Sequence, residues 1–215
     1  MHELLAPAFA GTRERWSLHI TNGFQSADAF LDIFITAAPT NTSSSIPTWS
    51  DFNPEHPAAD AAIQLFQQGV LTGLSDGTVL LDTKISRIET LVLVTRALGF
   101  SSLDGGDLPF PDTPASSWYA GTLRRAVEKG IVHGYGDSTF RPENTITLPE
   151  ALKILTISFG FASFSDQKNY AIWYIPYVDT AQKIGLVLPS EEINDTALSR
   201  GDFIMLLAKI VGMKK

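Results

Sequence analysis

The sequence predicts a mainly α-helical fold of three helix-loop-helix repeats around a pseudo-threefold axis, preceded by a short β-rich N-terminal segment. The first observation is an internal repeat. Residues 49–100 align without a gap on residues 110–161, and 12 of the 52 paired positions are identical. Ordinary composition would give about three identities. A third, shorter copy follows in residues 162–215. Repeats of this length are supersecondary units that stack to bury a shared core.

The second observation is an apolar stripe towards the end of each copy. Its spacing of i, i+3, i+4 and i+7 is typical of a helix with one buried face. The stripe consists of Leu91, Val94, Thr95 and Leu98, then Leu152, Leu155, Thr156 and Phe159, then Ile204, Leu207, Ala208 and Val211. We therefore expect three second helices to meet at the axis, with Leu91, Leu152 and Ile204 in contact, and three first helices to pack outside them.

The third observation is a capping motif at the start of each second helix. Ser86–Glu89 and Thr147–Glu150 have the pattern of a capping box, in which a hydroxyl and a glutamate satisfy free backbone N–H groups. Ser199–Asp202 is a shorter version. We interpret the three acidic residues mainly as caps. The copies are assigned to residues 49–103, 104–161 and 162–215.

The N-terminal segment, residues 1–36, has a different pattern. Trp16–Ile20 and Phe30–Ile35 are rich in aromatic and branched residues, which predicts two strands. Two strands are too few for independent stability, so we interpret them as the end of an upstream β domain or a small appendage. Residues 37–48 are rich in serine, threonine and proline, which is typical of a flexible linker.

Composition argues against several classes of protein. The net charge of −7 disfavours a nucleic-acid partner. The sequence contains no run of 18 apolar residues, so it predicts no membrane-spanning helix. The lack of cysteine removes thiolate nucleophiles and cysteine zinc sites. Asp76 and Asp137 lack the spaced carboxylates of a calcium loop. The histidines share no spacing with a carboxylate or serine, so we predict no catalytic residue, cofactor or metal site.

The second copy resembles the S-layer homology (SLH) family. It contains, in the order of the family pattern, Phe110–Asp112, Trp118-Tyr119, Gly134–Pro142 and Ile146–Glu150. The resemblance implies a three-copy, six-helix prism that binds secondary cell-wall polysaccharide, often pyruvylated, and anchors surface proteins without catalysis. It implies a monomeric module on the bacterial cell surface. Met1–Gly11 lacks the basic start of a signal peptide, so we expect a part of a longer exported chain.

The copies depart from the family pattern at places that matter for binding. The first copy has Pro57-Ala58 where the family has Trp-Tyr. The second has Leu148 where the family has arginine, and the third has Leu188–Glu191 in place of the Gly-Tyr loop. The second and third copies are therefore partly degenerate. The departures leave open a second hypothesis, a degenerate helical-repeat module that binds protein, such as an S-layer neighbour or another envelope protein.

The candidate polysaccharide site centres on two arginines. Arg87 and Arg200 lie in the first turn of a helix, where a cation opposes the helix dipole. With the free N–H groups there, they suit a ligand carboxylate such as that of a pyruvate ketal. We expect both at the surface, in grooves between repeats. The predicted site residues are Arg87, Arg200, Trp118, Trp173, Asp51, Asp112, Asp166, Gly73 and Gly134. Half-buried packing explains the tryptophans equally well, and turn formation explains the aspartates.

Overall fold

The computed structural model describes residues 47–163, 165, 170–187 and 195–213. Within these ranges the helices are α1 (Ala59–Gln67), α2 (Arg87–Ala97), α3 (Ala120–Glu128), α4 (Leu148–Ser158), α5 (Ile175–Lys183) and α6 (Arg200–Met213). The expected mainly α-helical fold is confirmed. The strands predicted in residues 1–36 and most of the predicted linker lie outside the described residues.

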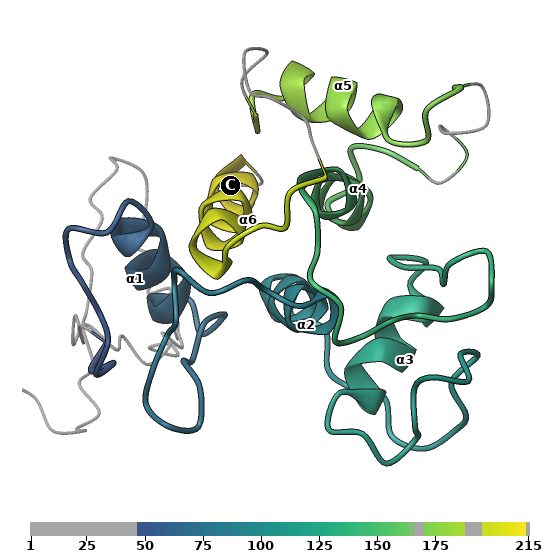
Figure 1. Cartoon of the computed structure of the whole chain (residues 1–215), viewed down its shortest axis with the longest axis horizontal. Coiled ribbons are helices and arrows are strands. Elements are labelled where there is room, and N and C mark those ends of the chain that lie inside the picture. The colour runs from purple at the N-terminus through teal and green to yellow at the C-terminus, as the bar shows by residue number, and fades with distance from the viewer. Residues whose placement is uncertain (1–46, 164, 166–169, 188–194, 214–215) are drawn as a thin grey trace, which may run out of the picture. The chain divides into compact units, whose positions relative to one another are not determined.

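The helices form an inner and an outer set (Figure 1). The inner helices α2, α4 and α6 pack on one another in every pairwise combination. The outer helices are α1, α3 and α5. Each of α3 and α5 packs on the inner helix of the preceding copy, namely α2 and α4, and α1 packs on α6. The first copy therefore packs against the third and closes the ring. Each outer helix packs on the inner helix of a different copy.

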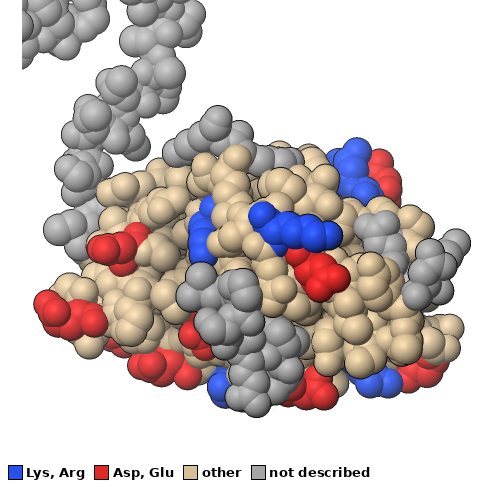
Figure 2. All heavy atoms as spheres, turned by 90° about the horizontal axis from the view of Figure 1, so that it is seen from above, with Lys and Arg blue, Asp and Glu red and all other residues tan. Residues whose placement is uncertain are grey.

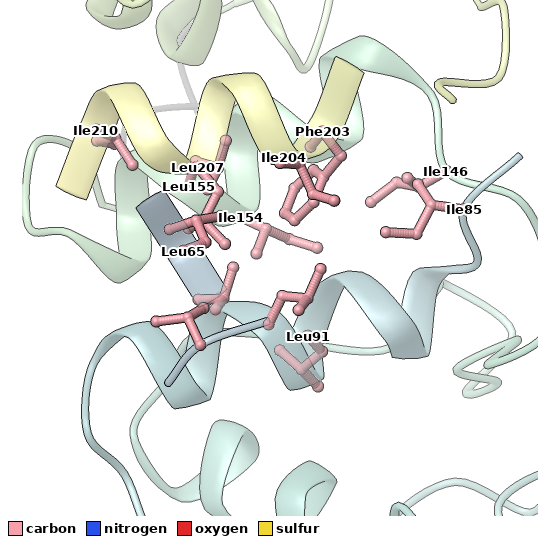
Figure 3. Close-up of a cluster of buried hydrophobic side chains, with 14 of the residues drawn as sticks. Leu65, Ile85, Leu91, Ile146, Ile154, Leu155, Phe203, Ile204, Leu207 and Ile210 are labelled. Atoms are coloured by element: carbon pink, nitrogen blue, oxygen red, sulfur yellow. The ribbon is translucent and has the colours of Figure 1, made fainter. Parts of the chain in front are cut away.

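A ring of backbone hydrogen bonds lies where the inner helices begin. Ile146 N–H donates to the carbonyl of Ile85 at 3.1 Å, Leu198 N–H donates to Ile146 at 2.9 Å, and Ile85 N–H donates to Leu198 at 3.2 Å. Figure 3 shows the side chains of Ile85 and Ile146 next to each other. Because each bond joins two different copies, the ring fixes the starts of the three inner helices relative to one another.

The three apolar stripes share one core (Figure 3). Leu91, Leu152 and Ile204 are all 0% exposed. The hydroxyls of Thr95 and Thr156 donate to the carbonyls four residues earlier, at 3.0 and 2.7 Å. This backbone bond satisfies a hydroxyl that has no access to water. The threonines are therefore small packing residues on the buried stripe, as their spacing predicts.

The caps of the inner helices follow the predicted pattern. The carboxylates of Glu89, Glu150 and Asp202 each accept a hydrogen bond from the backbone N–H three positions earlier, at 2.9, 3.1 and 3.2 Å. This bond satisfies an N–H group that the helix itself leaves without a partner. Because only one carboxylate oxygen is needed for the cap, the other oxygen of Glu89 and Glu150 is available for a second contact.

Candidate functional site

A cleft of about 930 Å³ lies where the second copy meets the third. Its walls are the loop Ile131–Tyr135, the first two turns of α4, and Trp173 just before α5. Arg87, from the first copy, completes the wall. The structure thus brings together three of the predicted site residues, Arg87, Gly134 and Trp173. We call this site the Arg87 cleft.

Arg87 is a largely buried part of the cleft wall, and its side chain is only 10% exposed. Its guanidinium lies over the rings of Tyr135 and Phe140, 4.9 and 4.8 Å from their centroids. Nη1 lies 3.9 Å from Oε1 of Glu150, and Nη2 donates to the carbonyl of His133 at 3.3 Å. Nε makes no hydrogen bond within the described residues. The expected surface position is wrong, because the cap glutamate of the neighbouring inner helix compensates this cation.

Glu150 connects the cap of α4 to the cleft. Its Oε1 accepts a hydrogen bond from the hydroxyl of Tyr135 at 2.6 Å. Burial of the phenol and this hydrogen bond raise the pKa of Tyr135 to about 12. The guanidinium of Arg141 also lies over the ring of Tyr135, 4.4 Å from its centroid. Tyr135 therefore contacts both guanidiniums and Glu150, and these side chains form one connected group in the cleft wall.

The hydrogen bond of Tyr135 can be tested by titration. The pKa of Tyr135 in the folded state, about 12, lies above the value of about 10 for an unfolded chain. Its contribution to stability is therefore complete below pH 10 and is lost as the pH rises through 12. We expect carbon NMR of the tyrosine ζ positions to show a late-ionising ring whose signal disappears in Tyr135→Phe. An ordinary pKa for this ring would show that the hydrogen bond to Glu150 does not persist in solution.

Lys153 belongs to α4, and its side chain lines the cleft. Its Nζ is 5.3 Å from the ring centroid of Trp173 and 5.4 Å from that of Tyr177. Burial and the positive charge of Arg87 lower the pKa of Lys153. Trp173 itself is 41% exposed. Its indole is thus held by a cation while part of its surface stays open to the cleft.

Asp51 and Asp112 hold turns and do not contact either arginine of the predicted site. The carboxylate of Asp112 accepts from the N–H groups of Phe140 at 2.9 Å and Arg141 at 2.7 Å. Asp51 accepts two equivalent bonds in the first copy, both at 2.8 Å. Arg141 and its counterpart Leu80 have φ angles of 56° and 50°, a region that L-residues rarely adopt. The aspartates therefore stabilise strained turns, which is the structural interpretation their sequence also allowed.

Gly73 and Gly134 make room for an aromatic ring. A Cβ atom on Gly134 would lie 2.5 Å from the ring of Phe110, and one on Gly73 would lie 2.3 Å from Nε1 of Trp49. Such distances are far inside van der Waals contact, so both glycines are required by packing. Gly134 also lines the Arg87 cleft. Asp166, the remaining acidic site residue, lies outside the described residues.

The other predicted arginine occupies the equivalent position one copy away. Nη1 of Arg200 lies 3.2 Å from Oε1 of Glu89, as Arg87 faces Glu150. The Arg200 side chain is 7% exposed, and burial lowers its pKa. The expected surface position is therefore wrong here as well. The pseudo-threefold rotation that relates Arg200 to Arg87 also relates Gly73 to Gly134 and Trp118 to Trp173. We call this position the Arg200 junction.

The third equivalent position combines the loss of the arginine, of the tryptophan and of the Gly-Tyr loop. Here the arginine is replaced by Leu148 of the second copy, and the tryptophan by Pro57 of the first. The loop comes from the third copy, whose sequence lacks the Gly-Tyr motif. The three losses are far apart in the sequence, and only the ring order of the copies shows that they concern a single junction. The Leu148 junction therefore lacks the arginine, the tryptophan and the Gly-Tyr loop of the Arg87 cleft.

Charge on the surface is dispersed. Figure 2 shows lysine, arginine, aspartate and glutamate as small separate groups on the face it presents, without a continuous patch of either sign. The basic residues of α3 are also engaged locally. Arg124 Nε donates to the carbonyl of Leu103 at 3.2 Å, and Arg125 Nε donates to Ser101 at 2.9 Å. These arginines fasten the segment that joins the first two copies.

The comparison with known families agrees with the motifs around the cleft. Residues 109–152 match the family model of the S-layer homology domain. The chain contains an S-layer homology domain. The matched segment supplies the loop of the Arg87 cleft and its cap glutamate, whereas Lys153 and Trp173 lie just beyond it. No helix within the described ranges has the length and apolar character needed to span a membrane.

Several curated proteins are similar to the chain that contains this S-layer homology domain. The surface-layer 125 kDa protein of Lysinibacillus sphaericus is 30% identical over 175 residues, which is 75% of this chain and 15% of that protein. The cell surface protein of Thermoanaerobacter kivui is 24% identical, over 74% of this chain and 20% of that protein. An endoglucanase of Bacillus sp. is 29% identical, over 54% and 12%. The chain thus spans a fifth or less of these relatives, and together with the family they indicate a bacterial cell-surface location.

Proposed function

We propose that this S-layer homology domain anchors the protein that carries it by binding an acidic, pyruvate-bearing secondary cell-wall polysaccharide in the Arg87 cleft. The family match and the relatives support a cell-surface anchoring module. The observation that carries the finer proposal is the composition of the cleft, which combines a partly exposed indole with three cations, Arg87, Arg141 and Lys153. Arg87 faces Glu150 at 3.9 Å and Arg141 is paired with Asp137 at 2.7 Å, while Lys153 adds a third positive charge. Asp195 also lines the cleft, in a chain whose net charge is −7.

The chemistry of the cleft suits a sugar that carries a carboxylate. A carboxylate forms its strongest hydrogen bonds with cationic donors, and the first turn of α4, which lines the cleft, adds the positive end of a helix dipole. The apolar face of a hexose ring complements the open surface of Trp173. A pyruvate ketal places the carboxylate beside that ring. Both features are therefore satisfied within one residue of the polysaccharide.

We infer that the chain is not an enzyme. The relative named endoglucanase matches over only 12% of its length, so its name does not transfer a catalytic activity.

We further infer that one junction dominates binding. The Leu148 junction lacks the arginine and the tryptophan, and the Arg200 junction has Leu80 and Val92 where the cleft has Arg141 and Lys153. We expect about one tight site in each chain.

Calorimetry with a synthetic glycan tests this proposal. The probe is the methyl glycoside of a hexose that bears a pyruvate ketal, and its carboxyl methyl ester is the uncharged control. We expect Trp173→Ala to weaken binding about tenfold, a loss of about 1.4 kcal/mol. Trp118→Ala is the matched control, because it removes the equivalent indole at the Arg200 junction and should leave the affinity unchanged. Equal binding of probe and ester would contradict recognition of a carboxylate.

Sedimentation with cell-wall sacculi extends the test to the natural polymer. We expect the wild-type protein to sediment with native sacculi and to stay in solution after acid removal of the wall polysaccharide. Persistent sedimentation with acid-treated sacculi would show that the wall polysaccharide is not the ligand. Failure to sediment with native sacculi would favour the protein-binding alternative.

A further inference from the structure

Lys153 has no counterpart at the other two junctions. The equivalent residue is Val92 in the first copy and Met205 in the third, both apolar. At the Arg87 cleft, Trp173 lies 5.3 Å from the Nζ of Lys153 and is 41% exposed, whereas Trp118, its counterpart at the Arg200 junction, is 70% exposed. The two tryptophans are thus equivalent in sequence but differ in how firmly the protein holds them.

A second aromatic ring also holds the ammonium group of Lys153 in position. Its Nζ lies over the fully buried ring of Tyr177, at 5.4 Å, as well as over Trp173. A cation that lies over an aromatic face attracts the ring. Tyr177 belongs to the core-facing side of α5, and Trp173 precedes the same helix. The ammonium therefore links the partly exposed indole of the cleft wall to a side chain that packing holds in place.

We propose that Lys153 is a positioning residue that holds Trp173 in the orientation that stacks on a sugar, and that it thereby makes the Arg87 cleft, rather than the Arg200 junction, the principal glycan site. An exposed indole must lose side-chain freedom when a ligand stacks on it, and an indole that is already held avoids most of this loss. The ammonium also lies where an anionic ligand enters, so its charge favours the same ligand. This inference rests on the proposed function and names the residue that selects the junction.

The first test compares Lys153→Met with Lys153→Arg by calorimetry, with the pyruvate-ketal hexoside as the probe. Methionine keeps the length of the side chain and removes the charge, so we expect binding to weaken roughly tenfold. Arginine restores a cation over the ring, so its affinity should stay within about threefold of wild type. In the absence of ligand, the indole N–H resonance of Trp173, assigned from Trp173→Phe, should move in Lys153→Met and stay near its place in Lys153→Arg.

A gain-of-function variant provides the second test. In a Trp173→Ala background, Val92→Lys introduces an ammonium at the position of the Arg200 junction that is equivalent to Lys153. We expect it to hold Trp118 and to restore part of the lost affinity for the probe. Lack of any restoration would overturn the claim that the lysine selects the junction. Unchanged affinity in Lys153→Met, or an unmoved Trp173 resonance in that variant, would overturn the positioning role while leaving the proposed function standing. Failure of the wild-type protein to bind the probe would instead refute the proposed function.

Discussion

Leu155→Ala is expected to lower the free energy of unfolding by about 2–5 kcal/mol, the range found when a large core side chain is truncated. Leu155 is 0% exposed and belongs to the inner helix α4, whose stripe faces both α2 and α6. The ring of copies leaves little room to collapse around the missing atoms, because each inner helix is held at its start by backbone bonds to its neighbours. Urea denaturation followed by circular dichroism measures the change.

The matched control for Leu155→Ala is Leu148→Ala on the same helix. Leu148 is only partly buried, at the edge of the core, so its truncation should cost about 1 kcal/mol. Leu207→Ala, on α6, should behave like Leu155→Ala, because Leu207 is also 0% exposed. Similar small losses for all three variants would contradict a common core around the pseudo-threefold axis.

Glu89→Gln is expected to lower the free energy of unfolding by about 3 kcal/mol. Glutamine keeps an acceptor for the cap of α2 but removes the negative charge that faces Arg200 at 3.2 Å. The Arg200 side chain is 7% exposed, so its cation would remain buried without a counter-charge. Removal of one partner from such a pair costs more than the pair contributes, because the remaining charge has lost its water as well as its partner.

The repeat supplies the control for this experiment. Asp202 has the same capping role on α6, but the position that faces it holds Leu148 instead of an arginine. Asp202→Asn should therefore cost only about 0.3–1 kcal/mol, the effect of a charge on the helix dipole. Equal losses in the two variants, measured by urea denaturation, would show that the cap rather than the ion pair accounts for the effect.

The buried arginines change how binding should be studied. Their position against the helix dipole suggests that they are dispensable for folding, and therefore that alanine variants are clean tests of binding. The structure corrects this interpretation, since each guanidinium is paired with a glutamate of the next inner helix. Loss of Arg87 or Arg200 would disturb the packing between copies together with any glycan contact. The tryptophans, which are more exposed, are better probes.

The features that sequence predicts well are local ones. The stripe of α4 and the capping box at Thr147–Glu150 depend on residues within a few turns, so their spacing is sufficient to place the helix and its start. The order of helices around the ring depends on contacts between copies, and no local pattern carries it. For example, Arg200 and Glu89 are 111 positions apart in the chain. Their pairing, and the burial that follows from it, required the structure.

The site was predicted in part. Sequence motifs identified Arg87, Gly134 and Trp173, and the structure brings these three together at one cleft. Lys153 and Tyr135 were missed because the family pattern gives them no role as ligands. A signal was nevertheless present, because they are polar or cationic where the first copy has Val92 and Leu74. Differences between copies of a repeat therefore mark the junction that carries a special function, as much as shared motifs mark the fold.

The contact between α1 and α6 gives the ring a mechanical property. These are the first and last helices of the described part of the chain, and they lie against each other. Tension applied between residues 49 and 213 would therefore act on the contact between α1 and α6 before it reached the other copies. Resistance to pulling depends on the rate at which this contact opens. A tether built in this way is loaded first where the first copy meets the last. That junction combines the apolar face of α1, where Ala59, Ala62 and Leu65 are buried, with the backbone bond between Ile85 and Leu198.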